Sequence, residues 1–336
     1  MNTDDSFSNI IIRKVQRLGA SSLTITIPKE WAKRHGINVG DSVIVIDEGN
    51  KLIILADNDE MLSTFYYSAR HSKLIKHIGK LSLCNYIGGA RRIVIEPLRP
   101  SITREIIEKI GKTFRYAPSV YIVKGSEGTI ILDMNEKSED PLDLIQAYTN
   151  LVTDLFSEIF SVLKGDSTRV SEEIHESLMR LSYKIIRSIN MDKVRTASNE
   201  VVANQLIVIS VLLNVLAEKL YLLAKTTAKL RGRLSSDELD RIMLLIQMLE
   251  VATVTALSSL SQTSVKKIEE SYWKIRSIKE LEEDLDEILE NASGPFTFLI
   301  AQILDVTTIL YMAESMMLCY TINSKYHEKS HSRAPR

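Results

Sequence analysis

The chain has few of the residues that cross-link a fold or interrupt helices. Its 336 residues include 2 cysteines, 7 prolines and 13 glycines. Cys84 and Cys319 lie far apart in apolar contexts, without a CxxC motif or a Cys/His cluster. This pattern argues against a disulfide scaffold and against a zinc ribbon. We therefore predict that both cysteines are buried packing thiols in a reducing compartment.

A long uninterrupted apolar run is also missing. The most apolar stretch, residues 206–224, is broken by Ser210, Asn214, Glu218 and Lys219. A bilayer span needs about 20 largely uninterrupted apolar residues, so we predict a buried helix here. The acidic and polar start, MNTDDSFSN, indicates that no secretory signal is present, and we expect a cytoplasmic protein.

The chain has neither a charge excess nor a catalytic pattern. Lys and Arg number 42 against 43 Asp and Glu, so a basic surface must arise from placement and not from composition. None of the 6 histidines stands in a recognisable motif with a nucleophile or an acid. An enzyme is therefore the least favoured class. The histidines are His35, His71, His77, His175, His327 and His331.

The N-terminal segment is the most informative part of the sequence. It contains three apolar runs rich in β-forming residues, at 10–15, 23–27 and 42–55, the last interrupted at 48–50. Pro28 opens a short helical stretch over residues 29–35, and Gly36 stops it. A segment of this size cannot close a hydrophobic core alone. We therefore expect it to interlock with a second copy of the chain.

Charges are segregated in this segment. Between residues 10 and 40 there are six basic residues and one acid, Glu30, so the local balance is +5. Such a cluster can pair with phosphates and gain from counterion release, or it can be a solvated surface. Charge alone leaves both interpretations open. The basic residues are Arg13, Lys14, Arg17, Lys29, Lys33 and Arg34.

Several residue types recur here at fixed offsets. They are Arg13-Lys14-Val15, Leu18-Gly19, Ile27-Pro28-Lys29, Trp31, Gly36-Ile37 and Gly40-Asp41-Ser42-Val43. This order resembles the AbrB/SpoVT/MazE swapped-hairpin DNA-binding domain. The resemblance implies a homodimer with interleaved strands, in which the first loop and the short helix contact double-stranded DNA. The implied DNA-binding residues are Arg13, Lys14, Arg17, Ser21, Ser22, Lys29, Lys33 and Arg34.

The sequence departs from this family after the Leu-Gly pair. Many bacterial members have Arg there, whereas this chain has Ala20-Ser21-Ser22. Backbone N–H groups and the two serine hydroxyls can bind phosphates, which position a protein on DNA without reading its bases. The departure therefore puts base recognition by this loop in doubt.

Residues 58–138 read as a small α/β connector. Mixed three- and four-residue spacing of apolar residues predicts a helix over 61–83, and Gly88-Gly89 predicts a tight turn before the next strand. The remaining elements that we predict are strands at 92–96, 120–123 and 129–132 and a helix at 101–112.

The rest of the chain reads as helix nearly throughout. Six predicted helices fall into two sets of three, at 141–164, 170–190, 195–228, 235–262, 264–292 and 296–324. An apolar row in the first helix marks a face that is buried in a bundle: Leu142, Ile145, Thr149, Val152, Phe156, Ile159 and Leu163. Residues 325–336 carry four lysines and arginines against one acid and read as a disordered tail.

The order of these parts resembles the archaeal-type PhoU proteins, which are phosphate-uptake regulators. PhoU bundles carry an acidic row that binds metal, and here the nearest segment holds Asn214 and Glu218. The resemblance implies a divalent or ferric metal there, supplemented by the acidic run 282–287. Hard cations want several oxygen ligands, and Asn214 replaces one carboxylate. The alternatives are a satisfied buried pair and a solvated acidic face.

The sequence therefore predicts a multidomain α+β fold. Its predicted parts are a swapped-hairpin β domain at 1–57, the α/β connector at 58–138, an all-α pair of three-helix bundles at 139–324 and the tail at 325–336. The favoured function is a dimeric DNA-binding transcriptional regulator with a PhoU-like sensory or interaction module, linked to phosphate homeostasis. The alternative is a regulator of a membrane phosphate transporter that acts through protein contacts. An antitoxin fares worse, because those proteins end in short toxin-wrapping tails.

Overall fold

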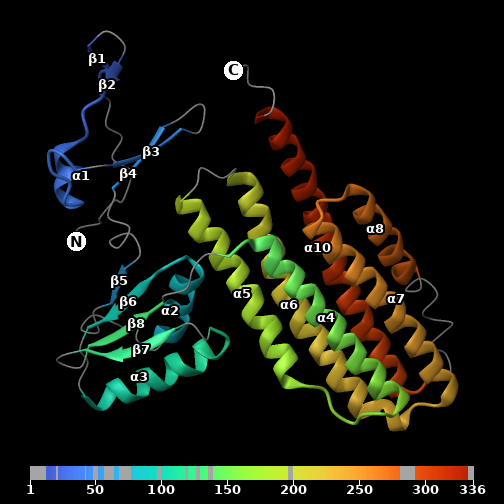
Figure 1. Ribbon diagram of the computed structural model, residues 1–336. Helices are drawn as coiled ribbons and strands as arrows, with labels where there is room; N and C mark the ends of the chain where they lie inside the picture. The colour runs from blue at the N-terminus through green and yellow to red at the C-terminus, as the bar shows by residue number, and fades with distance from the viewer. Residues whose placement is uncertain are drawn as a thin grey trace, which may run out of the picture. The chain divides into compact units, whose positions relative to one another are not determined.

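The computed structural model divides the chain into two compact units, residues 1–63 and 64–336 (Figure 1). The structure describes residues 13–19, 22–41, 43–47, 52–56, 64–67, 77–96, 100–117, 120–125, 129–134, 139–195, 200–280 and 292–331.

The first unit consists of two hairpins and a short helix. Its elements are β1 (Gln16–Leu18), β2 (Ser22–Thr24), α1 (Lys29–Arg34), β3 (Val43–Asp47) and β4 (Leu52–Ala56). Both hairpins, β1–β2 and β3–β4, are antiparallel two-stranded sheets. The first strand begins later than predicted, because residues 13–15 lie outside it, and residues 10–12 are not among the described residues.

Several apolar side chains that the structure describes in the first unit are exposed to solvent. None of its described side chains is buried, and Leu23 and Leu52 are 75% and 62% exposed. Val15, Val39 and Val45 are also exposed. A two-stranded hairpin is at best marginally stable in water, because it has nothing to cover its apolar face.

The second unit begins with a two-layer α/β module. Its elements are β5 (Thr64–Tyr67), α2 (Ile78–Ile87), β6 (Arg92–Ile95), α3 (Pro100–Thr113), the 3-10 turn η3 (Phe114–Tyr116), β7 (Tyr121–Lys124) and β8 (Ile130–Asp133). The sheet order is β5-β6-β8-β7, and only the pairing of β5 with β6 is parallel. Ile93 and Leu132 are paired across the sheet, and both pack with Ile106 of α3 in one core.

The predicted helix over residues 61–83 is wrong at residues 64–67, and its residues 61–63 and 68–76 lie outside the described residues. Thr64–Tyr67 is a strand, and the helix runs over Ile78–Ile87. The strand contains three consecutive aromatic residues, which fit a pleated sheet well, and it gains a parallel neighbour in β6. Apolar spacing at three and four residues did not distinguish the two structures. The predicted turn is confirmed, because Gly88 caps α2 and Gly89 has a φ of +93°.

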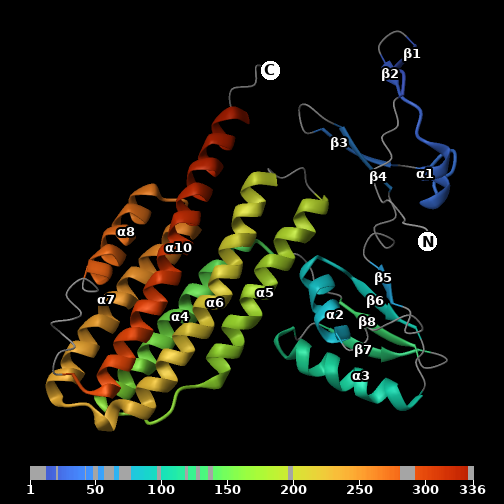
Figure 2. The ribbon, with the colours of Figure 1, turned by 180° about the vertical axis from the view of Figure 1, so that it is seen from behind.

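The rest of the second unit is a helical bundle (Figure 2). Its helices are α4 (Pro141–Lys164), α5 (Glu172–Arg195), α6 (Glu200–Leu230), α7 (Ser236–Ser261), α8 (Val265–Glu280) and α10 (Gly294–His331), with the turn η5 (Arg231–Arg233) after α6. Asp140 caps α4, and Ser235 and Glu238 form a capping box on α7. The predicted disordered tail is wrong for residues 325–331, where α10 continues.

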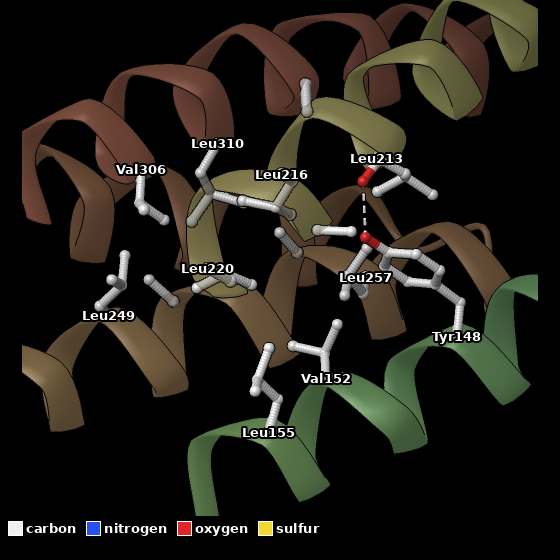
Figure 3. Close-up of a cluster of buried hydrophobic side chains, with 14 of the residues drawn as sticks. Tyr148, Val152, Leu155, Leu213, Leu216, Leu220, Leu249, Leu257, Val306 and Leu310 are labelled. Carbon is white, nitrogen blue, oxygen red and sulfur yellow. Dashed lines mark hydrogen bonds between the residues drawn. The ribbon is translucent and has the colours of Figure 1, made fainter. Parts of the chain in front are cut away.

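One hydrophobic cluster joins all six of these helices, so the two predicted sets share a core. Figure 3 shows its middle, where Leu216 of α6, Leu257 of α7 and Val306 of α10 converge. The Tyr148 hydroxyl donates to the Leu213 carbonyl at 2.6 Å, which gives this buried hydroxyl a hydrogen-bond partner. The predicted apolar row of α4 is confirmed, since its members from Ile145 to Leu163 are all buried.

Two features of the second unit bear on predictions about cysteine and membranes. Cys84 on α2 and Cys319 on α10 are free and exposed, so the prediction that both are buried is wrong. Each lies on the solvent side of its helix, which an apolar sequence context did not reveal. Three helices are long and apolar enough to cross a membrane, at Glu200–Arg233, Ser236–Ser261 and Gly294–Ser324, and 44% of the most apolar window of each is buried inside the fold.

A buried arginine links the α/β module to the bundle through hydrogen bonds and a cation–π contact. Arg187 of α5 is 1% exposed. Its Nη1 donates to the carbonyls of Tyr86 and Ala90 at 2.6 and 2.8 Å, and its guanidinium lies over the Tyr86 ring at 4.5 Å. These carbonyls belong to the end of α2 and the turn after it, where helical carbonyls lack partners within the helix. The module and the bundle are therefore joined through a charged, fully enclosed contact.

Candidate nucleic-acid interface

The basic residues predicted to contact DNA lie on the surface of the first unit. All six are exposed, and so is Ser22 at the start of β2. Ser21 lies outside the described residues. Arg13, Lys14 and Arg17 precede or form β1, whereas Lys29, Lys33 and Arg34 belong to α1. The cationic groups therefore come from two neighbouring segments of one small unit.

Backbone hydrogen bonds stabilise the first and last turns of the helix α1. The Ala32 amide donates to the Pro28 carbonyl at 3.0 Å, and the Ile37 amide donates to the Ala32 carbonyl at 2.9 Å. The rings of Trp31 and His35 lie 5.0 Å apart, on the side of the helix that is partly covered. Six residues are too few for a stable helix in isolation. These local contacts therefore place Lys33 and Arg34 in its last turn.

The motif after α1 forms a tight, polar loop. Gly36 and Gly40 have φ values of +65° and +98°, which only glycine adopts without strain. The backbone N–H of Asn38 donates to the Asp41 carboxylate at 2.7 Å. The recurrent Gly-Ile and Gly-Asp pairs are thus explained by backbone geometry, because they turn the chain from α1 into β3.

The predicted metal ligands lie on α6, facing α5. The Asn214 amide donates to the Ser182 hydroxyl at 2.9 Å, and the Glu218 carboxylate lies 3.3 Å from Nε2 of His175. In the part of the chain that the structure describes, no three His, Cys, Asp or Glu side chains come together as a metal site. The acidic run 282–287 lies outside the described residues.

Sequence reasoning missed His175, the partner of Glu218. Its ring is buried, and it stacks on Tyr221 at 4.2 Å between centroids and meets Tyr116 edge-on at 6.4 Å. Tyr116 belongs to η3 of the α/β module, so His175 lies where the module and the bundle meet. A histidine isolated in sequence gave no sign of this position.

A buried acid lies between α8 and α10. Glu314 is 2% exposed, and one of its carboxylate oxygens lies 2.6 Å from the Ser271 hydroxyl. Burial raises the pKa of Glu314 to about 7, and the hydrogen bond from Ser271 offsets part of that rise. The Ser271 hydroxyl can also donate to the Ile268 carbonyl at 2.9 Å, an arrangement that suits a protonated Glu314.

Comparison with known proteins adds one result to this geometry. Residues 9–59 match the protein-family model described as antidote-toxin recognition MazE, a bacterial antitoxin. The first unit carries an AbrB/MazE-like domain. The match includes every basic residue of the candidate interface and the turn motif after α1, and it ends before the α/β module. No curated protein and no solved structure matched the chain.

Proposed function

We propose that the chain is a dimeric, cytoplasmic DNA-binding transcriptional regulator whose helical unit senses a signal. One observation carries this proposal: none of the side chains that the structure describes in the AbrB/MazE-like domain is buried, and several apolar ones on its strands are exposed in the same unit as a cluster of cations. The apolar strands need a protein partner, and the cations suit a polyanion.

A second copy of the chain supplies the missing core. Val45 on β3 lies opposite Ile54 on β4, and the same face carries Leu52. Val45 and Leu52 are both mostly exposed. Burying such side chains stabilises each by about 1.5–3 kcal/mol, which two interleaved copies achieve symmetrically. Dimerisation also doubles the number of cations on one assembly.

Double-stranded DNA is the polyanion that best fits these cations. Lysine and arginine side chains that neutralise phosphates release condensed counterions, which gives affinity and a strong dependence on salt. The Ser22 hydroxyl and nearby amides add contacts that position the protein without reading sequence. Recognition of particular bases must then come from other groups in the domain.

The helical unit is the proposed sensor. The resemblance to PhoU proteins suggests a link to phosphate homeostasis, and Arg187 of α5 holds the α/β module on the bundle within the second unit. A phosphate-transporter partner rests on the resemblance alone. Co-purification of transporter subunits with the tagged chain, in the absence of promoter binding, would favour that role.

The test is a salt titration of DNA affinity with the full chain. A double variant, Arg13→Ala with Lys33→Ala, should weaken binding to all sequences. It should also reduce the slope of log affinity against log salt by about 0.9 for each phosphate that the variant no longer neutralises. Fluorescence anisotropy of a labelled promoter fragment measures both quantities.

The control removes the same charge from another place. Arg104 and Lys112 lie on exposed parts of α3 in the second unit. The variant Arg104→Ala with Lys112→Ala should leave the affinity and the slope unchanged. Equal reductions in the two double variants would show that overall charge, and not this interface, governs binding. Unchanged binding in the first variant would place the interface elsewhere.

An antitoxin is the second candidate, and the description of the matching family favours it. Against it stands the packed bundle that follows the domain in place of a short extended tail. Co-expression with a toxin encoded beside it distinguishes the two. Rescue of growth through a complex with that toxin would support the antitoxin role, whereas promoter occupancy without rescue would support the regulator.

A further inference from the structure

The bundle contains an apolar pocket at one end of α8. The pocket has a volume of about 250 Å³ and lies between α7, α8 and α10, which run side by side in Figures 1 and 2. Leu244 and Met248 of α7 and Phe296 and Ile300 of α10 form much of its wall. Leu244 remains 59% exposed, so apolar surface here is open to solvent.

One cation stands on the wall of this apolar space. Arg241 lines the pocket one turn before Leu244, and its guanidinium pairs with Asp237 at 3.0 Å. Both side chains of this pair are more than half exposed, and exposed pairs within one helix are weak. Asp237 lies in the first turn of α7, where the helix dipole stabilises a carboxylate without any arginine. Arg241 can therefore turn toward another anion at little cost.

We propose that this pocket binds a free, small amphipathic monoanion: an aliphatic chain that ends in a carboxylate. The chain fills the apolar space, and the carboxylate pairs with Arg241. This proposal rests on the sensory role inferred above and names the class of ligand for it. The pocket lies just below the range of about 300–1,000 Å³ that is typical of ligand sites, so the ligand is small.

The size of the pocket gives a test by chain length. Decanoate serves as the probe, with octanoate and dodecanoate on either side, titrated into the full chain by isothermal calorimetry. Decanoate should bind roughly 15-fold more tightly than octanoate, because each buried methylene adds about 0.8 kcal/mol. Dodecanoate should show no further gain, since the pocket is then full. An affinity that rises without a plateau would indicate nonspecific adsorption and overturn the proposal.

The role of Arg241 is tested by charge. Arg241→Gln should weaken decanoate binding about tenfold, because a charge-assisted pair is removed. The affinity for decanol, which has no charge, should not change. The matched control is Arg276→Gln on α8, which breaks an i,i+4 pair of similar exposure with Glu280 at 2.9 Å. Arg276 does not line this pocket, so its variant should bind decanoate as the native chain does.

A blocking variant tests the site without touching the charge. Leu244→Trp enlarges a side chain at the exposed side of the pocket and should abolish decanoate binding while the melting temperature stays close to native. Equal affinity for decylamine and decanoate, equal weakening in Arg241→Gln and Arg276→Gln, or binding to phosphatidylglycerol vesicles without binding of free decanoate would each overturn the proposal.

The two proposals fail in different ways. DNA affinity is measured on the ligand-free chain, and decanoate affinity is measured without DNA. DNA binding with no saturable decanoate binding overturns the pocket alone. Decanoate binding that follows the chain-length and Arg241 pattern, with no DNA binding, overturns the regulator and leaves the pocket in place.

Discussion

The two units of this chain differ in how far their apolar side chains are buried within a single chain. In the bundle, Leu155, Leu216 and Leu257 are fully buried in a core that a single chain completes. In the first unit, Leu23 and Leu52 stand in solvent. Since both units use the same apolar residue types, composition cannot tell them apart. The difference lies in segment length: long helices bury whole faces against each other, whereas strands of three to five residues need a partner.

The largest effect should come from a charge placed on the exposed strands. Val45→Asp costs little in a single chain, because the side chain is already in solvent. In an interlocked dimer the same carboxylate is buried without a partner, which costs several kcal/mol. We expect sedimentation velocity to show loss of the dimer, with DNA affinity falling more than about 100-fold.

The control for this prediction is an exposed valine of the bundle. Val251→Asp on α7 should leave the sedimenting mass of the dimer and the DNA affinity unchanged. If Val45→Asp still forms a dimer that binds DNA, the strands of the first unit are not the dimer interface, and the contrast between the units disappears.

A core truncation in the bundle should have the next largest effect. Leu216→Ala on α6 removes a fully buried side chain and should lower the free energy of unfolding by about 2–5 kcal/mol. Leu222 on the same helix is about half exposed, and Leu222→Ala should change stability by less than about 0.5 kcal/mol. Urea denaturation followed by circular dichroism measures both. A large loss of stability in Leu222→Ala would mean that the exposed face of α6 is also covered by other residues.

Glu314 should make the bundle less stable as the pH rises. Its pKa is about 7 in the fold against an ordinary value of 4.5, so the folded state binds the extra proton between these values. The stability that this proton provides is fully present below about pH 4.5 and is lost as pH rises through about 7. We expect Glu314→Gln to remove this dependence and to stabilise the chain at pH 8 by about 1–3 kcal/mol. Denaturation midpoints from pH 5 to pH 8 that stay parallel in both proteins would refute the prediction.

The smallest effect is expected at Glu238, with the opposite sign. Hydrogen bonds from Ser235 and Ser293 lower the pKa of Glu238 to about 2. The stability from this carboxylate is present above about pH 4.5 and is lost as pH falls through about 2. Glu238→Gln should therefore reduce the acid sensitivity of the melting temperature between pH 4.5 and pH 2. A Ser235→Ala variant, which removes only the other half of the capping box, should keep most of that sensitivity.

The sequence predicted well wherever one local pattern determined the structure. The predicted bounds 141–164 are those of α4, which Asp140 caps and Gly165 ends, and most of the predicted apolar row lies on its buried face. In the first unit, Gly36 was predicted to stop the short helix, and α1 ends at Arg34, with Gly36 at a positive φ two residues later. In each of these cases a capping residue, a positive φ or a repeated spacing operates within a few residues.

The sequence failed where distant segments decided the outcome. Thr64–Tyr67 became a strand because β6 lies beside it, and Cys319 became exposed because no helix covers its side of α10 in the described part of the chain. His175 and Glu218 meet through the docking of two helices, which no spacing encodes. The same holds for the buried pair of Glu314 and Ser271, whose residues are separated by 43 positions.

The buried Arg187 also sets an order of events during protein synthesis. The carbonyls that it holds, at Tyr86 and Ala90, lie 101 and 97 positions earlier in the chain. At about 5–20 residues per second, a ribosome needs roughly 5–20 seconds to cover that distance. Throughout this interval, water or a chaperone must occupy the site on the Tyr86 and Ala90 carbonyls that the guanidinium later fills. The α/β module therefore reaches its final form only when α5 has emerged, and a nascent chain halted before residue 187 would present an unfinished surface to quality control.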